Sequence, residues 1–198
     1  MRSSSCSPDG HGLEPLGCLG RNEMTNKVRG MHHIGITVPD IEEGISFFKA
    51  VFGAVEVFRT GPFDVDQDFM ENKLGAARHS KIRDLVFLRC GNGTSVELFE
   101  YEGESVSPPK RSSEVGGMHL CFEVDDVDAA ADRLRDQGVE LLDGPNLVDA
   151  GPLAGFNWIY FRAPWGLILE VASFTSLGYE DTSSERLWRP DETLSAEP

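Results

Sequence analysis

Two histidines and two glutamates occupy matching positions in two similar stretches of the sequence. His33 begins the stretch His-Ile-Gly-Ile-Thr-Val-Pro-Asp-Ile, which aligns without a gap on His119-Leu-Cys-Phe-Glu-Val-Asp-Asp-Val. In each copy a glutamate inside an apolar strand follows later, as Val-Glu97-Leu and as Leu-Glu170-Val. Two imidazoles and two carboxylates form a mixed donor set that suits octahedral Ni, Co, Mn, Fe or Zn. The repeat therefore predicts a divalent metal site made of His33, Glu97, His119 and Glu170.

The predicted strand positions of these residues explain why an ion is expected. Alternate side chains of a strand share a face, so each histidine lies opposite its apolar neighbours. Both glutamates stand between residues that favour a core, and an unpaired buried carboxylate costs several kcal/mol or becomes protonated. A divalent ion compensates that charge and leaves two coordination positions open for water or substrate. The alternative interpretation is that the histidines are ordinary strand residues and the glutamates point into solvent from edge strands.

Other reactive side chains are weaker candidates. His32 has the opposite strand phase to His33, His79 lies in a polar stretch, and His11 lies near the N-terminus. Cys121 shares the metal face of its strand, but a small buried residue is the simpler interpretation. Some aromatic residues could line a pocket or pack in the core: Phe63, Phe69, Trp158, Tyr160 and Trp165.

The elements that must position the four ligands form two modules of the same order. The first has a strand at 31–38, a helix at 41–52 that follows Pro39-Asp40 and ends at Gly53, and strands at 55–58, 84–89 and 95–101. The second has a strand at 119–124, a helix at 127–137, and strands at 139–142, 157–162 and 167–173. The predicted fold class is α+β, with paired βαβββ modules that form a curved mixed sheet around the metal site.

The segments around these modules show no sustained helical or strand period. We therefore expect a flexible leader (1–29), a first module (30–103), a linker (104–116), a second module (117–175) and an acidic flexible tail (176–198). A chain cut to residues 30–175 is expected to stay folded and metal-loaded.

The composition of the chain argues against nucleic-acid binding and against a membrane-spanning protein. The chain has 198 residues, 40% of them hydrophobic, and a formal net charge of -15, which would repel nucleic acid and anionic membranes. Its four cysteines show no CxxC spacing, which indicates a reducing compartment. No apolar run of about eighteen residues and no secretory signal is present, so the expected location is the cytoplasm.

With these motifs the sequence resembles the vicinal oxygen chelate superfamily over roughly residues 30–174. This group includes glyoxalase I, methylmalonyl-CoA epimerase, cyclitol-ketone epimerases, extradiol dioxygenases, and fosfomycin and bleomycin resistance proteins. The resemblance matches His33 and Glu97 to the ligands of the first module, and His119 and Glu170 to those of the second. Ring-cleaving dioxygenases of the group use two histidines and one carboxylate, so Glu97 favours proton transfer.

The resemblance implies a metal-dependent isomerase, epimerase or lyase of the glyoxalase type. Its metal would stabilise an enediolate formed when a base removes the proton next to a carbonyl, with a small hydroxy-ketone, a cyclitol or sugar-like ketone, or a hemithioacetal as substrate. By family analogy Glu170 is the main base and Glu97 its counterpart on the opposite face. Alternatives are an Fe(II) extradiol-type dioxygenase and a resistance protein that sequesters a drug or metabolite. A homodimer is expected because paired modules leave edge strands to cover.

Overall fold

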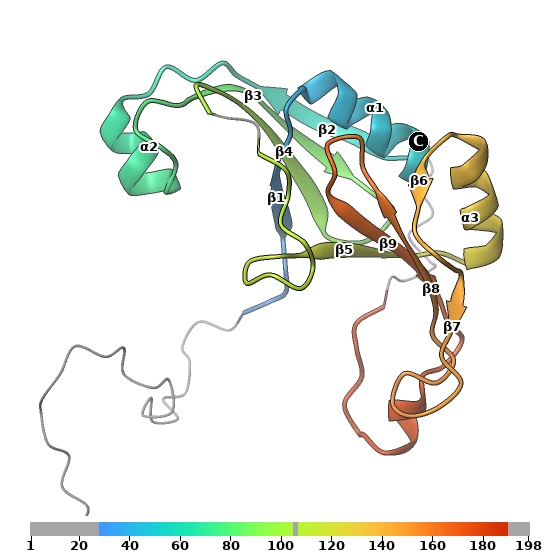
Figure 1. Cartoon of the computed structure of the whole chain (residues 1–198). Coiled ribbons are helices and arrows are strands. Elements are labelled where there is room, and N and C mark those ends of the chain that lie inside the picture. Colours follow the sequence, from blue (N-terminus) through green and yellow to red (C-terminus); the bar gives the residue numbers. More distant parts are fainter. Residues whose placement is uncertain (1–27, 105–106, 190–198) are drawn as a thin grey trace, which may run out of the picture. The chain divides into compact units, whose positions relative to one another are not determined.

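The computed structural model of the protein describes residues 28–104 and 107–189 (Figure 1). A compact unit begins at Met31. The expected leader lies outside the described residues except for its last two positions. In the part of the chain that is described, no helix is long and apolar enough to cross a membrane.

The first module is a four-stranded sheet with a helix on one face. Its elements are β1 (His33–Thr37), α1 (Ile41–Phe52), β2 (Val55–Thr60), α2 (Gln67–Leu74), β3 (Lys81–Arg89) and β4 (Ser95–Glu102). The strand order is β1-β4-β3-β2, with β1 parallel to β4 and the other neighbours antiparallel. The first strand of the module therefore lies at one edge of its sheet, beside the strand that carries Glu97.

The second module repeats this topology. Its elements are β5 (His119–Glu123), α3 (Val127–Asp136), β6 (Glu140–Leu141), β7 (Asn146–Leu147), β8 (Asn157–Arg162) and β9 (Ile168–Ser173). The order is β5-β9-β8-β6, β7 also pairs with β8, and β5 is parallel to β9. The predicted α+β fold with two βαβββ modules is confirmed, and the curved mixed sheet takes the form of one sheet in each module.

Local sequence signals explain the two helices that follow β1 and β5. The Asp40 side chain accepts a hydrogen bond from the Glu43 backbone N–H at 2.9 Å and caps α1. Gly53 ends α1 in the left-handed conformation, with φ of 62°. Asp126 caps α3 in the same way, through the backbone N–H of Asp128. The sequence therefore predicts α1 at its observed bounds, and α3 to within one residue.

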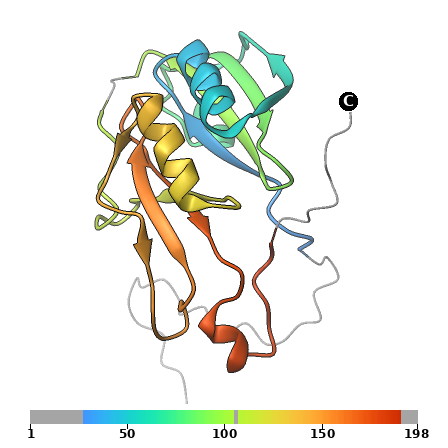
Figure 2. The same cartoon turned by 90° about the vertical axis from the view of Figure 1, so that its right-hand side faces the viewer.

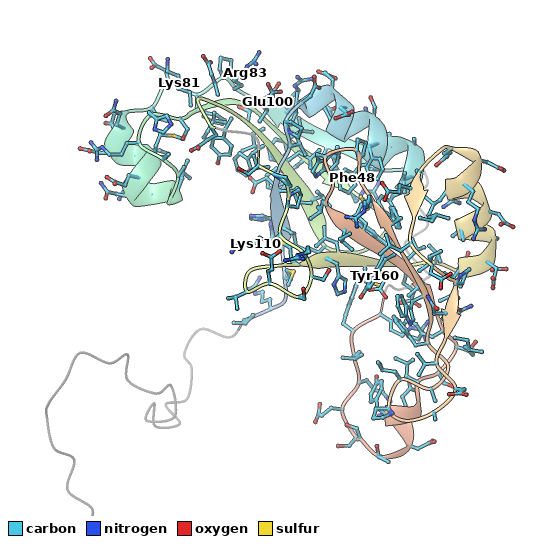
Figure 3. The ribbon with its side chains drawn as sticks, viewed as in Figure 1. Phe48, Lys81, Arg83, Glu100, Lys110 and Tyr160 are labelled. Carbon is cyan, nitrogen blue, oxygen red and sulfur yellow. The ribbon has the colours of Figure 1, made fainter. Side chains whose placement is uncertain are left out.

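One hydrophobic core joins the two modules. Phe48 of α1, labelled in Figure 3, is fully buried in it, and the Phe52 ring stacks on Phe122 of β5 with centroids 3.9 Å apart. Figures 1 and 2 show α1 and α3 side by side. The Arg133 guanidinium of α3 donates to the Val51 carbonyl at the end of α1, at 3.4 Å. The helices and the apolar faces of both sheets thus pack together. The opposite faces of the sheets carry the predicted histidines and glutamates.

Two short elements of the modules were not predicted. The helix α2 buries only Met70, so its sequence carries little helical periodicity. Its signals are the Asp66 cap, which accepts from the Phe69 backbone N–H at 2.7 Å, and the left-handed Gly75 that ends it. The two-residue strand β7 is too short to leave a pattern.

Residues 176–189, part of the expected flexible tail, make specific contacts with the second module. A 3-10 helix spans Gly178–Asp181, and Leu177 before it is 4% exposed. The Gly178 N–H donates to the Ala154 carbonyl at 3.0 Å. The Arg189 guanidinium pairs with Glu123 of β5 and lies over the Phe174 ring, 4.2 Å from its centroid. Residues 190–198 lie outside the described residues.

We predict that a chain ending at residue 175 melts at a lower temperature than the full chain. It loses the buried Leu177 side chain, which stabilises the fold by about 2 kcal/mol, and this corresponds to a loss of about 5 °C in melting temperature. Calorimetry measures the difference, and a chain ending at Arg189 is the control because it keeps every contact described above. Equal melting temperatures of all three chains would show that this segment adds no stability.

Candidate metal and catalytic site

The first predicted pair of ligands lies on the exposed face of the first sheet. His33 is the first residue of β1, and Glu97 lies in β4 between the buried Val96 and Leu98. The His33 Nε2 atom is 3.3 Å from the Glu97 Oε2 atom. The Phe87 ring lies edge-on beside the imidazole, with centroids 5.3 Å apart. The pair therefore combines an imidazole that is 40% exposed with a carboxylate side chain that is 13% exposed.

The second pair repeats this arrangement in the second module. His119 is the first residue of β5, and its Nε2 atom is 3.1 Å from the Oε2 atom of Glu170 in β9. The Tyr160 ring of β8 lies beside the imidazole, with centroids 5.1 Å apart. The Glu170 side chain is 6% exposed and that of His119 is 38% exposed. A buried carboxylate thus meets a histidine that solvent or a ligand can reach.

The strand registers of the two pairs are the same. Gly35 of β1 is opposite Glu97, and Cys121 of β5 is opposite Glu170. Both glutamates lie on inner strands, since β4 runs between β1 and β3, and β9 between β5 and β8. The alternative interpretation of glutamates on edge strands is therefore wrong.

The structure does not gather all four residues into one cluster. Among the described residues, no group of three or more His, Cys, Asp and Glu side chains is placed so that it could hold a metal ion. Each module instead presents a separate His–Glu pair. A four-ligand site made of His33, Glu97, His119 and Glu170 requires the two pairs to come together, and it stays a prediction.

Burial and negative charge shape the electrostatics around Glu170. Burial raises the pKa of the Glu170 carboxyl, while the neighbouring His119 and Cys121 oppose the shift. Cys121 is exposed, so its interpretation as a small buried residue is wrong, but desolvation of the thiol and then the charge of Glu170 raise its pKa to about 12. Burial and the same charge also raise the pKa of Tyr160. Cys121 and Tyr160 are therefore neutral near pH 7.

Residues 30–171, which include both pairs, match the family model of the Glyoxalase/Bleomycin resistance protein/Dioxygenase superfamily. The chain belongs to this superfamily. The resemblance inferred from the sequence motifs is thereby confirmed.

Individual relatives are epimerases. A 2-epi-5-epi-valiolone epimerase from Actinomyces sp. is 39% identical over 168 residues, which are 83% of this chain and 91% of the relative. A mitochondrial methylmalonyl-CoA epimerase from Bos taurus is 26% identical over 145 residues, 72% of this chain and 68% of the relative. A solved glyoxalase family protein from Bacillus cereus shares the fold, with a TM-score of 0.61 at 19% identity over 78% of this chain and 100% of that chain.

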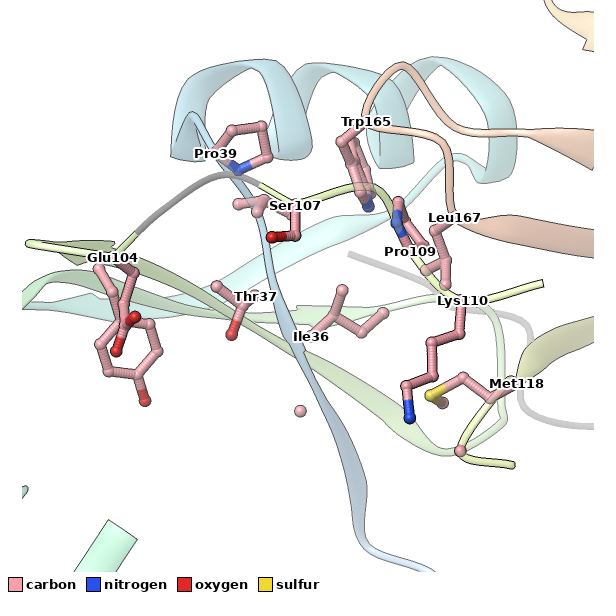
Figure 4. Close-up of a pocket in the computed structure, with 14 residues that line it drawn as sticks. Ile36, Thr37, Pro39, Glu104, Ser107, Pro109, Lys110, Met118, Trp165 and Leu167 are labelled. Carbon is pink, nitrogen blue, oxygen red and sulfur yellow. The ribbon is translucent and has the colours of Figure 1, made fainter. Parts of the chain in front are cut away.

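A pocket of about 440 Å³ lies along β1 of this superfamily member, and neither His33 nor Glu97 is among the residues that line it. Gly35 lines it, and a Cβ atom built on Gly35 would lie 3.7 Å from the Glu97 Oε2 atom. Tyr101 of β4 also lines the pocket, and burial together with the charge of Glu97 raises the pKa of its hydroxyl. The other walls come from the linker and from the turn before β9 (Figure 4). Gly35, which is opposite Glu97 in the β1–β4 pair, is thus the position at which the pocket comes near this carboxylate.

The sequence identifies some residues of these surfaces and not others. Trp165, which the sequence offers as a pocket or core aromatic, lines the pocket, whereas the position of Tyr160 beside His119 is not predicted. The strand phase of Tyr160, directly opposite Glu170 in the β8–β9 pair, could have identified it once that pairing was assumed. No sequence signal indicates Lys110, because its linker has no periodic pattern.

Proposed function

We propose that this protein is a metal-dependent epimerase that inverts a carbon next to the carbonyl of a cyclitol ketone. The observation that carries the proposal is the pair of matching His–Glu contacts, one in each module, at 3.3 Å and 3.1 Å. The similarity to a 2-epi-5-epi-valiolone epimerase over 91% of that relative supports the reaction and the substrate class.

The donor atoms of both pairs fit a divalent ion. Two atoms bound at right angles, each about 2.1 Å from one ion, lie about 3 Å apart, close to the spacing in both pairs. We assign His33, Glu97, His119 and Glu170 as the ligands of one divalent ion, drawn from Ni, Co, Mn, Zn and Fe. Such an ion supplies Lewis-acid polarisation of the substrate carbonyl.

Glu170 is the proposed base, and Glu97 is the proposed acid. Glu170 removes the proton from the carbon next to the carbonyl, and Glu97, when protonated, returns a proton to the opposite face of that carbon. The identical registers support this division, because they place one carboxylate in an equivalent position of each module. Removal on one face and return on the other inverts the configuration.

A homodimer is part of the proposal. The edge strand β2 is exposed along its whole length, and its apolar side chains remain in contact with solvent: Val55, Val57 and Phe58. An exposed apolar edge strand favours association with another chain. Association of two copies also offers a way to join a first-module pair to a second-module pair.

The assay that tests the function is epimerisation of 2-epi-5-epi-valiolone in deuterium oxide under anaerobic conditions, with methylmalonyl-CoA in parallel. We expect inversion of the cyclitol ketone with one solvent deuteron incorporated next to the carbonyl. Treatment with a chelator should reduce the rate to background, and Mn²⁺ or Ni²⁺ should restore it.

Each competing function gives a different result in this assay. An extradiol-type dioxygenase would be inactive without oxygen, and a sequestering protein would bind a ligand without turnover. If the metal-loaded protein inverts neither compound, the proposed substrate class is wrong.

A further inference from the structure

The pocket along β1 contains backbone groups that strand pairing does not use. Because β1 is the end strand of its sheet, no strand of the described chain lies on its other side. In the parallel pair with β4, Val38 donates its N–H to the Phe99 carbonyl at 2.8 Å. Alternate residues of such a strand direct their N–H and C=O groups to opposite sides, so those of Gly35 and Thr37 point toward the free edge. Both residues line the pocket.

Lys110, which belongs to the linker, places its positively charged ammonium group in the same pocket. Its Nζ atom donates to the Val115 carbonyl at 2.8 Å, which fixes the side chain and leaves two of its three N–H donors. Within the described residues, no carboxylate forms an ion pair with it, although the chain has a net charge of -15. Figure 4 shows Lys110 and Glu104 at opposite ends of the pocket, with Thr37 between them. Lys110 is thus available to bind an oxygen atom of a ligand.

The rest of the lining combines hydroxyl groups with apolar surface. Thr37, Tyr101 and Ser107 contribute hydroxyls, and Trp165 and Leu167 contribute apolar area. A polyhydroxylated ring matches this lining, because its C–H faces pack on apolar side chains while its hydroxyls both donate and accept hydrogen bonds. A CoA thioester fits poorly, since its phosphates require several cations and Lys110 is the single basic residue among the described residues of the lining.

We infer that this pocket binds the hydroxyl-bearing part of a cyclitol substrate, and that Lys110 is a specificity-determining residue that holds a ring hydroxyl remote from the reacting carbon. The inference rests on the proposed epimerase function for the identity of the reaction. It assigns the linker a role as one wall of the substrate pocket, with the free edge of β1 as the other. Gly35 brings the pocket near Glu97, because a Cβ atom built on this pocket residue would lie 3.7 Å from the Glu97 Oε2 atom.

The test of binding uses myo-inositol, a cyclitol without a ketone, and the full chain in buffer with a chelator. Saturation-transfer NMR should show saturable binding to the wild-type protein. Lys110→Met should weaken binding about 10-fold to 100-fold, the usual effect of losing a hydrogen bond to a charged group, and Lys110→Arg should restore part of it. Lys73→Met, at an exposed position of α2 outside the pocket, is the control and should bind like the wild type.

Because Lys110 also closes the linker through Val115, Ser107→Ala serves as a second variant that leaves this contact intact. It should weaken binding by several-fold, as expected for one neutral hydrogen bond. Absence of saturable binding in the wild-type protein would overturn the assignment. Wild-type affinity in both the Lys110→Met and Ser107→Ala variants would do so as well.

Kinetics with the cyclitol ketone separates this inference from the proposed function. Lys110→Met should raise KM about tenfold or more with kcat nearly unchanged, since a hydroxyl remote from the carbonyl is bound equally in ground and transition states. A lower kcat with unchanged KM contradicts the binding role.

Inositol binding that depends on Lys110, without epimerase activity, would support the pocket and refute the reaction. Epimerase activity without inositol binding would refute the pocket and support the reaction.

Discussion

The Glu170→Gln variant is expected to lose about 1,000-fold in kcat while it retains much of its metal. Glutamine keeps an oxygen donor at the same position of β9 but cannot accept the proton, and a positioned general base contributes about 100-fold to 10,000-fold. The substitution also removes a charge from a side chain that is 6% exposed, so it should not destabilise the fold. The measurements are kcat, metal content by mass spectrometry, and solvent-deuterium exchange at the carbon next to the carbonyl.

The exchange experiment assigns each glutamate to one face of the substrate carbon. With Glu170→Gln, the epimer whose proton faces Glu170 should stop exchanging, and with Glu97→Gln the other epimer should stop. Glu102→Gln, at the exposed end of β4, is a matched control for the loss of one negative charge. Wild-type exchange of both epimers in metal-loaded Glu170→Gln protein would remove Glu170 from proton transfer.

His33→Ala and His119→Ala should each weaken metal binding by about 100-fold or more and abolish activity. Even the hydrogen-bond partners of metal ligands contribute about 10-fold to 100-fold to affinity, and a direct ligand contributes at least as much. Both imidazoles begin their strands and are well exposed, at 40% and 38%, so the melting temperature of the metal-free protein should change little. Metal titration and calorimetry on each variant test both statements. Unchanged metal occupancy would remove that histidine from the site.

A mixture of these two variants decides where the two pairs meet. If a site joins the first-module pair of one chain to the second-module pair of another, a dimer of His33→Ala with His119→Ala chains contains one intact site. Co-expression should then restore part of the activity and metal content. If the pairs come together within one chain, every site lacks a ligand and nothing is restored. Either outcome shows whether the four-residue site forms within one chain or between two chains, which the two separate pairs do not decide.

The sequence by itself determined two things: the bounds of elements that have local start and stop signals, and the repeat of one module order. The helix α1 follows from Asp40, Gly53 and its buried apolar stripe, all of which act within a few residues of one another. The βαβββ order and the shared face of each histidine and glutamate follow from strand alternation in two copies. The predicted site joined all four residues, whereas the structure brings them together as two His–Glu pairs on neighbouring strands.

Tertiary structure decided the features that depend on contacts distant in sequence. The register that sets Gly35 opposite Glu97 is a pairing between strands with α1, β2, α2 and β3 between them. The pocket needs Lys110 from a linker without periodicity and Trp165 from a turn, and their proximity results from packing of the two modules. Separation of His33, Glu97, His119 and Glu170 into two pairs is likewise a property of module placement. Residue types and strand phase specify which side chains share a face, whereas packing between modules specifies which faces meet.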